Sequence, residues 1–352
     1  MKNKKVIITG ILGQDGANMA EFLLKNTDHE IYGMMRRSSN PNFINAKAFK
    51  DNPRFKFVFG DLGDEVSLDS LVKEIQPDYF INFAANSFVG ISWNMPLQVF
   101  DTNTLGVIRS LEAIRKFKPD CRFYSAGSSE EWGDVEYSPQ NINHPIKPRS
   151  PYGASKAAAR HLIKVYRESY GMYAVHGILF NHEGTKRGEE FVTRKISKGV
   201  ANIYHSLKAG DLNFNPISLG NLHSKRDWSD SEDFVEGVWL MLNQPTPKEY
   251  ILSSNKTHSV KEFVERAFSA ARIMGCWLNE DNPEKMVYAM PVLDDVEYAA
   301  LVVVDPALYR PAEVDLLWGD SSPIRSELGW SPKSSFGDLV KKMVEYDIKN
   351  FS

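Results

Sequence analysis

Short apolar runs alternate with longer amphipathic segments throughout the first half of the chain. Short apolar runs are typical of strands buried on both faces, and apolar residues at i, i+3 and i+4 are typical of helices. We predict strands at Val6–Thr9, Glu30–Met35, Phe55–Phe59, Tyr79–Phe83, Arg122–Ala126 and Ala174–Phe180. We predict helices at Gln14–Lys25, Leu68–Gln76, Leu97–Lys116 and Pro151–Tyr170. This alternation predicts right-handed βαβ units and therefore an α/β fold with a doubly wound parallel sheet.

The pattern changes after Asn181, where loops become longer and strands become isolated. We predict strands at Ile217–Leu219, Tyr250–Leu252 and Val302–Val304, and helices at Phe191–Leu207, Ser231–Leu242, Val260–Ile273 and Phe336–Ile348. We interpret this half as a smaller, mixed α/β lobe that is interleaved with the first. The expected division groups residues 1–181 with 217–250, and residues 182–216 with 251–352.

Composition narrows the class of protein. The 352 residues are 42% hydrophobic and 25% charged, which suffices for a packed core, and the formal charge of −3 gives no footprint for nucleic acid or an anionic membrane. The two cysteines exclude a disulfide framework, and the histidines lack metal-ligand spacing, so we expect no metal site. No apolar run is long enough to span a membrane, and the N-terminal run is too short for a secretory leader. We therefore expect a cytoplasmic protein.

Three glycines follow the first predicted strand and open the first helix, in the pattern Gly10-x-x-Gly13-x-x-Gly16. Glycines at these positions permit a tight turn and close backbone approach, and the helix N-terminus then faces a pyrophosphate. A turn that merely needs glycine is the alternative. The order of strand, glycines and helix favours a dinucleotide site of the Rossmann type.

The end of the second predicted strand indicates which dinucleotide. An NAD site usually has Asp or Glu there to accept from the ribose hydroxyl, whereas this chain has Arg36, Arg37, Ser38 and Ser39. Guanidinium and hydroxyl groups suit a 2′-phosphate, so we predict NADP, with an ordinary exposed arginine pair as the alternative. Polar or small residues also follow the third and fourth strands, where α/β sheets bind ligands. These residues are Asp61, Leu62, Ala84, Ala85, Asn86 and Ser87.

A candidate catalytic group combines Tyr152 and Lys156, which lie one helical turn apart, with Ser128 and Glu130 after the fifth strand. An ammonium at that distance favours the phenolate, so we expect Lys156 to lower the pKa of Tyr152. The Tyr-x3-Lys spacing alone is common. A strand end and the next helix N-terminus can bring all four side chains to one pocket, although the serine and carboxylate could also form only a turn.

Longer motifs carry a more specific resemblance. They are ITGILGQDG, RRSS, FGDL, RSPYGASK, GILFNHE, RGEEFVTRKIS, SLGNLHSKRDW, YRPAEVDLLWGD and an LGW-x-P segment. Together, over about residues 4–348, they resemble the GDP-mannose 4,6-dehydratase family of the extended short-chain dehydrogenase/reductase superfamily. The resemblance implies an NADP-binding domain (residues 1–181 and 217–250), a GDP-sugar-binding lobe (residues 182–216 and 251–352), and a homodimer or homotetramer.

The resemblance also assigns residues to roles. Catalytic roles fall on Ser128, Glu130, Tyr152 and Lys156. The cofactor site is expected to comprise Gly10, Gly13, Gln14, Asp15, Gly16, Arg36, Arg37, Ser38, Ser39, Asp61, Leu62, Ala84, Ala85, Ser87, Lys156, His182 and Arg187. The GDP-sugar is expected to contact Ser87, Ser129, Asn181, Val192, Lys195, Arg226, Arg310 and Glu313.

The implied reaction is an internal redox cycle with loss of water. Tyr152 takes the proton from O4 of the sugar while NADP takes the C4 hydride, and Glu130 then takes the C5 proton. Water leaves from C6, and the hydride returns there. A 4-epimerase or 4-oxidoreductase of the same superfamily would not need Glu130, and a non-catalytic nucleotide sensor could lose all the catalytic residues.

The chain departs from the family pattern near the sugar. Ser128 replaces a threonine, and the family's SELYG reads Ser129-Glu130-Glu131-Trp132-Gly133. Phe88 and Gly90 stand where the family has His and Lys in a QSHVK run. We expect more room and less charge there, which favours a sugar larger than mannose, such as GDP-D-glycero-D-manno-heptose. The alternative is that both residues lie behind the site and that the substrate is GDP-mannose.

Overall fold

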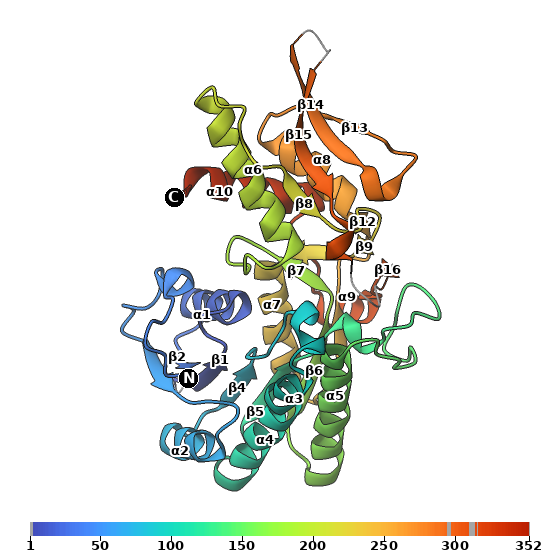
Figure 1. Cartoon of the computed structure of the whole chain (residues 1–352). Coiled ribbons are helices and arrows are strands. Elements are labelled where there is room, and N and C mark those ends of the chain that lie inside the picture. The colour runs from blue at the N-terminus through green and yellow to red at the C-terminus, as the bar shows by residue number, and fades with distance from the viewer. Residues whose placement is uncertain (1–2, 294–296, 310–313, 315, 352) are drawn as a thin grey trace.

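The computed structural model describes residues 3–293, 297–309, 314 and 316–351, and its larger part is a seven-stranded parallel sheet (Figure 1). The strand order is β11-β6-β5-β4-β1-β2-β3, which is a doubly wound sheet and confirms the predicted fold class. Its strands are β1 (Lys5–Thr9), β2 (Glu30–Met35), β3 (Phe55–Phe59), β4 (Tyr79–Asn82), β5 (Arg122–Ala126), β6 (Ala174–Leu179) and β11 (Tyr250–Leu252).

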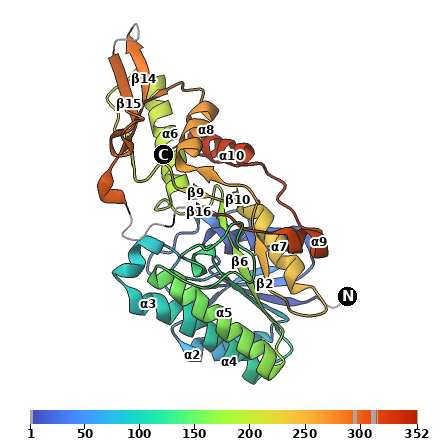
Figure 2. The same cartoon turned by 90° about the vertical axis from the view of Figure 1, so that its right-hand side faces the viewer.

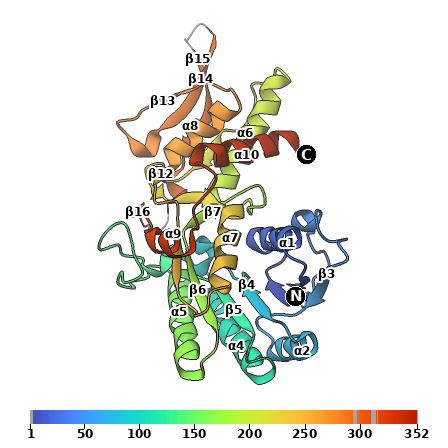
Figure 3. The ribbon, with the colours of Figure 1, turned by 180° about the vertical axis from the view of Figure 1, so that it is seen from behind.

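Helices cover both faces of this sheet, because its strands are apolar on both sides. Val6 and Ile8 of β1 pack against α1 and α7, while Ile7 between them packs against α2, α4 and α5. Figure 3 shows α1 and α7 side by side on one face. The helices are α1 (Gln14–Asn26), α2 (Glu65–Ile75), α4 (Gly106–Phe117), α5 (Pro151–Tyr170) and α7 (Ser231–Leu242).

The single helix predicted over Leu97–Lys116 is instead three segments. These are α3 (Pro96–Phe100), a π-helical turn η3 (Asp101–Leu105) and α4. The π turn directs Asn103 toward α5, where its amide donates to the Ser155 hydroxyl at 3.0 Å. Asn103 also accepts from the Asn86 backbone amide at 2.9 Å. The irregular turn therefore joins the loop after β4 to the helix that carries Tyr152.

The second part is built on a four-stranded sheet with three helices packed against it (Figure 2). The sheet order is β13-β14-β15-β8, with strands Cys276–Leu278 (β13), Val287–Leu293 (β14), Glu297–Val304 (β15) and Ile217–Leu219 (β8). The helices are α6 (Val192–Lys208), α8 (Val260–Ala270) and α10 (Phe336–Lys349). Only Val302–Val304 of the β13–β15 meander was predicted as a strand. Pro291 and two register shifts interrupt the alternation there, which weakens the sequence signal.

Two small sheets lie where the parts meet. One joins β7 (Asn181–Glu183) to β10 (Trp228–Asp230), and the other is ordered β12-β9-β16 (His258–Ser259, Lys225–Arg226 and Leu316–Leu317). The chain thus passes between the larger and the smaller part more often than the expected division into two groups of residues implied. Strand β8 pairs with β15 in the smaller sheet, and not with the large sheet as the expected segment 217–250 implied. Helix α9 (Ser322–Leu328), which precedes α10, returns to pack on β11 of the large sheet.

No helix in the described part of the chain is long and apolar enough to cross a membrane.

Candidate active site

A cleft of about 1290 Å³ opens at the carboxyl ends of the large sheet's strands, between the two parts. Its walls come from the loops after β1, β2, β4 and β5, from the start of α5, and from α6 and the β7 region of the second part. Open α/β sheets bind ligands at this edge. The cleft is large enough for two nucleotide-sized molecules.

The glycine turn at one end of the cleft has the geometry that the sequence predicts. Gly10 has a φ of +68°, and a Cβ there would lie 2.9 Å from the Ala84 backbone nitrogen. A Cβ on Gly16 would lie 2.4 Å from the Gly10 carbonyl oxygen, and Gly13 forms the N-cap of α1. Only glycine fits at positions 10 and 16, and the turn leaves the first amides of α1 free to face a phosphate. The residues fit a dinucleotide.

Asp15 and His182 form a partly buried ion pair beside this turn, although they lie far apart in sequence. The His182 Nε2 is 2.9 Å from the Asp15 carboxylate, and its Nδ1 donates to the Phe180 carbonyl oxygen at 2.7 Å. Burial alone would lower the pKa of His182, but Asp15 outweighs it, so the pKa is raised. The pKa of Asp15 is lowered, because His182 and Arg187 outweigh its own burial. The pair holds β7 against the start of α1.

The end of β2 presents polar side chains to the cleft. Arg36 and Ser38 line it, whereas Arg37 and Ser39 do not, and all four are exposed. Of the four residues expected to bind a 2′-phosphate, two therefore line the cleft and two do not. The Asp61 carboxylate accepts from the Gly63 amide at 2.8 Å within its own turn.

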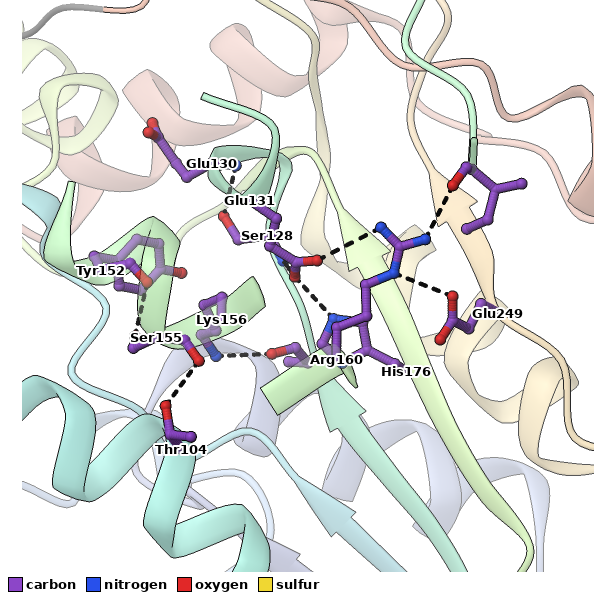
Figure 4. A network of polar contacts seen from close by, with 12 residues as sticks. Thr104, Ser128, Glu130, Glu131, Tyr152, Ser155, Lys156, Arg160, His176 and Glu249 are labelled. Carbon is purple, nitrogen blue, oxygen red and sulfur yellow. Dashed lines mark hydrogen bonds and ion pairs between the residues drawn. The ribbon is translucent and has the colours of Figure 1, made fainter. Parts of the chain in front are cut away.

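Ser128 and Glu130 lie on a single helical turn, η4 (Ser129–Glu131), that follows β5 directly. The Ser128 hydroxyl accepts from the Glu130 amide at 3.2 Å, and the Glu131 carboxylate accepts from the Ser128 amide at 2.9 Å. This reciprocal arrangement is a capping box. It buries Ser128 and leaves the Glu130 side chain half-buried in the cleft wall (Figure 4).

Tyr152 and Lys156 lie on the first turns of α5, which Ser150 caps by accepting from the Gly153 amide at 3.0 Å. Lys156 donates to the Ala126 carbonyl oxygen at the end of β5, at 2.7 Å. Burial lowers the pKa of Lys156 to about 8, against the opposing charges of Glu131 and Asp15. The Lys156 hydrogen bond thus joins the end of β5 to the start of α5, as the sequence predicts.

The expectation that Lys156 lowers the pKa of Tyr152 is wrong for the free protein. Burial raises the pKa of Tyr152 to about 12; interaction with the Ser128 hydroxyl opposes the rise, and the charge on Glu130 adds to it. The Lys156 ammonium is 5.9 Å from the centre of the tyrosine ring and is directed at Ala126. At neutral pH the free protein therefore holds the phenol protonated.

The structure brings most of the predicted site residues to the cleft. The predicted residues that line it, besides those described above, are Gln14, Leu62, Ala84, Ala85, Ser87, Ser129, Asn181, Arg187, Val192, Lys195 and Arg226. Arg310 and Glu313 lie outside the described residues. The described residues contain no group of His, Cys, Asp or Glu that could hold a metal ion.

The expected extra room at Gly90 is filled by a neighbour. A Cβ on Gly90 would lie 2.9 Å from the tip of the Phe88 ring, so the ring occupies the space that the missing side chain leaves. Phe88 meets Phe191 edge-on at 6.0 Å, and the Arg187 guanidinium stacks on Phe191 at 3.5 Å. This wall of the cleft is aromatic, and it is not enlarged at Gly90.

Sequence reasoning missed two sets of residues, one behind the cleft and one in its wall. Glu131 and His176 are fully buried partners of the catalytic turn, and the Ser-x-x-Glu spacing of a capping box was the available signal for Glu131. Phe191 lies inside the RGEEFVTRKIS motif but has no chemistry that marks it. No sequence pattern pointed to His176, because its contact with Glu131 depends on the pairing of β6 with β5.

Comparison with known proteins places the chain. The family model described as GDP-mannose 4,6 dehydratase matches residues 7–343. The chain belongs to the GDP-mannose 4,6-dehydratase family. The Drosophila melanogaster protein of that name is 40% identical over 99% of this chain and 87% of its own length. The Yersinia enterocolitica protein is 40% identical over 98% of this chain and 94% of its length, and the human protein 39% over 97% and 91%.

Solved structures share the fold of this GDP-mannose 4,6-dehydratase family member. A dTDP-glucose 4,6-dehydratase from Bacillus anthracis, in complex with NAD, superposes with a TM-score of 0.77 at 21% identity, over 99% of this chain and 97% of that one. The protein RMD from Pseudomonas aeruginosa, complexed with NADPH, gives 0.75 at 19% identity, over 99% of each chain. A UDP-glucose 4-epimerase from Thermotoga maritima gives 0.80 at 19% identity, over 99% and 100%. At these identities the likeness establishes the fold.

Proposed function

We propose that this protein is a GDP-sugar 4,6-dehydratase that converts GDP-mannose, or a closely related GDP-manno sugar, to the GDP-4-keto-6-deoxy sugar. The observation that carries the proposal is the cleft itself. It combines a glycine turn suited to a dinucleotide with Ser128, Glu130, Tyr152 and Lys156 at the adjoining strand end. Membership of the GDP-mannose 4,6-dehydratase family supports the same substrate class.

A nicotinamide dinucleotide is the cofactor that this cleft fits, and we propose NADP. Arg36 and Ser38 line the cleft beyond β2, and no carboxylate follows that strand directly. A 2′-phosphate would gain charge-assisted contacts there, while a ribose hydroxyl would lack its usual acceptor. The charged Asp15–His182 pair keeps β7 against the glycine turn that would hold the pyrophosphate.

The bound nicotinamide would supply hydride chemistry, taking hydride from C4 of the sugar and returning it to C6. Tyr152 would take the proton from O4. Its pKa of about 12 in the free protein means that a cation near the ring is required before the phenol becomes an effective base. Lys156 reaches the same region from the next helical turn and would hold the ribose and stabilise the phenolate.

Glu130 would take the C5 proton once C4 is a ketone, because a carbonyl makes the neighbouring C–H acidic. Its carboxylate lies in the cleft wall one turn from Ser128, which can donate to the C4 oxygen. The protonated Glu130 can then deliver its proton to the departing C6 hydroxyl. A 4-epimerase or 4-oxidoreductase would not need this carboxylate, so its presence favours elimination of water.

We propose that the larger part binds the cofactor and the smaller part binds the GDP-sugar. Asn181, Val192 and Lys195 line the cleft from β7 and α6. We also propose a homodimer or homotetramer, as is usual in the family. GDP-D-glycero-D-manno-heptose stays a candidate substrate, because the aromatic wall at Phe88 and Phe191 could pack against an extended C6 substituent.

The deciding experiment incubates purified protein with GDP-mannose, the GDP-manno-heptose, GDP-glucose and UDP-glucose, each with NADP or NAD. Mass spectrometry of the products distinguishes loss of water from epimerisation, which conserves mass, and from net oxidation, which consumes cofactor. Loss of water from a GDP-manno sugar with no net change in cofactor absorbance is the expected result. Epimerisation, or net oxidation, would contradict the proposal, and kcat/KM values would rank mannose against heptose. A true substrate should lead by about 10-fold, the scale of one well-placed hydrogen bond.

A further inference from the structure

Glu131 is a buried carboxylate immediately behind the catalytic turn, and it does not line the cleft. By the resemblance to the SELYG motif, Glu131 stands where that motif has leucine. A carboxylate that replaces an apolar core residue is costly unless it is paired, so its partners indicate what it does. Rigid packing alone would be served by leucine.

One oxygen of Glu131 serves two partners. Its Oε1 accepts from the Ser128 amide at 2.9 Å and from the His176 Nε2 at 2.8 Å. A Cβ on Gly127 would lie 2.2 Å from His176 Nε2 and 2.6 Å from Glu131 Oε1, so the glycine before Ser128 allows this close approach. The other oxygen faces Arg160 Nη1 at 3.9 Å. His176 is fully buried and Arg160 is nearly so.

The network continues away from the cleft and anchors Arg160 (Figure 4). Arg160 Nε pairs with Glu249 at 3.1 Å, and its Nη2 donates to the Ile142 carbonyl oxygen at 3.0 Å. Glu131 is therefore held from β6 by His176 and from α5 by Arg160. Helix α5 also carries Tyr152, so the network ties the catalytic turn to the catalytic helix.

We propose that Glu131 is a positioning residue for the dehydratase reaction: its carboxylate, held by His176 and Arg160, fixes the turn that carries Ser128 and Glu130. This inference rests on the proposed function for its kinetic test only. Two of its contacts act on the catalytic group directly, one through the Ser128 amide and one through charge.

The charge has a defined direction of effect. Burial lowers the pKa of Lys156, and the negative charges of Glu131 on η4 and Asp15 on α1 raise it. The pKa of Glu131 is lowered because His176 and Arg160 outweigh its burial, so the negative charge is present at neutral pH. Removing that charge would lower the pKa of Lys156 further.

Loss of the Glu131 charge would change the pKa of Tyr152 in the same direction as that of Lys156. Glu130 and Glu131 raise its pKa, while Ser128 and Arg187 lower it, all on top of the dominant effect of burial. Neutralising Glu131 would therefore lower the pKa of the phenol as well. Both limbs of the pH profile of kcat/KM should move toward acid together, which a purely structural role would not cause.

Two substitutions at Glu131 separate charge from position. Glu131→Gln keeps an oxygen for the Ser128 amide and removes the charge, so the profile should move toward acid by about half a unit or more. Glu131→Leu, the family residue, also removes the acceptor, so kcat should fall by about 10-fold or more with a smaller change in KM. Hydrogen exchange at Gly127–Gly133 should accelerate in Glu131→Leu, because the Ser128 amide loses its acceptor.

His176 and Asp233 supply the controls. His176→Gln keeps an N–H donor for Glu131 and should keep the wild-type pH profile of kcat/KM. His176→Leu removes that donor and should shift the profile. If the Glu131 variants fail to fold, these two His176 variants test the proposal instead. Asp233 is another buried carboxylate, accepting from the Lys333 and Ser334 amides outside the cleft, so Asp233→Asn should lower the melting temperature and leave the profile unchanged.

The possible results are distinct. Folded Glu131→Gln and Glu131→Leu proteins with the wild-type profile, kcat and exchange rate would overturn the inference. Wild-type protein that dehydrates no GDP-sugar would overturn the proposed function instead. In that case the exchange rate at Gly127–Gly133 still tests whether Glu131 holds the turn.

Discussion

Replacing Gly153 by alanine should separate the catalytic helix from the catalytic turn. Gly153 follows Tyr152 on the first turn of α5, and a Cβ there would lie 2.4 Å from the Glu130 carbonyl oxygen. The obstacle is backbone, so no side chain can rotate away to relieve the overlap. Carbon and carbonyl oxygen approach to about 3.3 Å at the closest. The two elements must therefore move apart by roughly 1 Å.

The cost to catalysis follows from that displacement. A misplacement of about 1 Å between reacting groups can lower the rate by about 10²-fold, or about 3 kcal/mol of activation free energy. Alanine is favoured over glycine within a helix by about 1 kcal/mol, which offsets part of the strain of overpacking. We therefore expect Gly153→Ala to fold, to bind cofactor and to lose most of its turnover.

The assay is kcat and KM for dehydration of GDP-mannose, with thermal unfolding measured on the same samples. Gly237→Ala is the matched control, since a Cβ at that helical glycine of α7 would meet the Leu252 side chain at 2.5 Å, away from the cleft. It should change stability and leave kcat intact. Wild-type kcat in a folded Gly153→Ala protein, or an equal loss in Gly237→Ala, would refute the reasoning.

Three further predictions concern the catalytic and cofactor residues. Glu130→Gln keeps the size of the side chain but removes the base for C5, so the rate of dehydration should fall by about 10²-fold or more. Cofactor binding, measured by fluorescence, should persist. Full dehydratase activity in this variant would contradict the role of Glu130. Arg36→Asp should shift the cofactor preference toward NAD by about 1–2 kcal/mol in Kd, and unchanged NADP affinity in a folded variant of unchanged oligomer mass would mean that Arg36 does not reach the 2′-phosphate. Because burial lowers the pKa of Lys156 to about 8, the ammonium is lost as pH rises through that value, and kcat/KM should fall there. Lys156→Arg keeps its charge at every accessible pH, so a profile in that variant that still falls near pH 8 would assign the limb to another group.

The sequence by itself determined the fold class and named site residues most of which line the cleft. Strands buried on both faces leave a continuous apolar signal, as at Val6–Thr9, and the glycine spacing at Gly10, Gly13 and Gly16 records a local turn. Tyr152 and Lys156 could be paired because helical spacing is local. Each of these features depends on neighbouring residues, and neighbouring residues are what a sequence pattern contains.

Tertiary structure decided the electrostatics and the walls of the site. The pKa of Tyr152 follows from burial against loops that are remote in sequence, so the expected lowering by Lys156 was wrong for the free protein. The sequence predicted added space at Gly90, but the Phe88 ring occupies that space. Burial and ring orientation depend on how distant segments pack, and no local pattern encodes that.

The pairing of Glu131 with His176 illustrates the same limit. The Ser-x-x-Glu spacing could suggest a cap at Ser128, but 45 residues separate the carboxylate from the imidazole that holds it. They meet only because β5 and β6 lie side by side in the sheet and Gly127 lets the two groups approach. The sequence supplied the carboxylate and its cap, and the sheet register supplied its partner, because register is set by the packing of the whole domain.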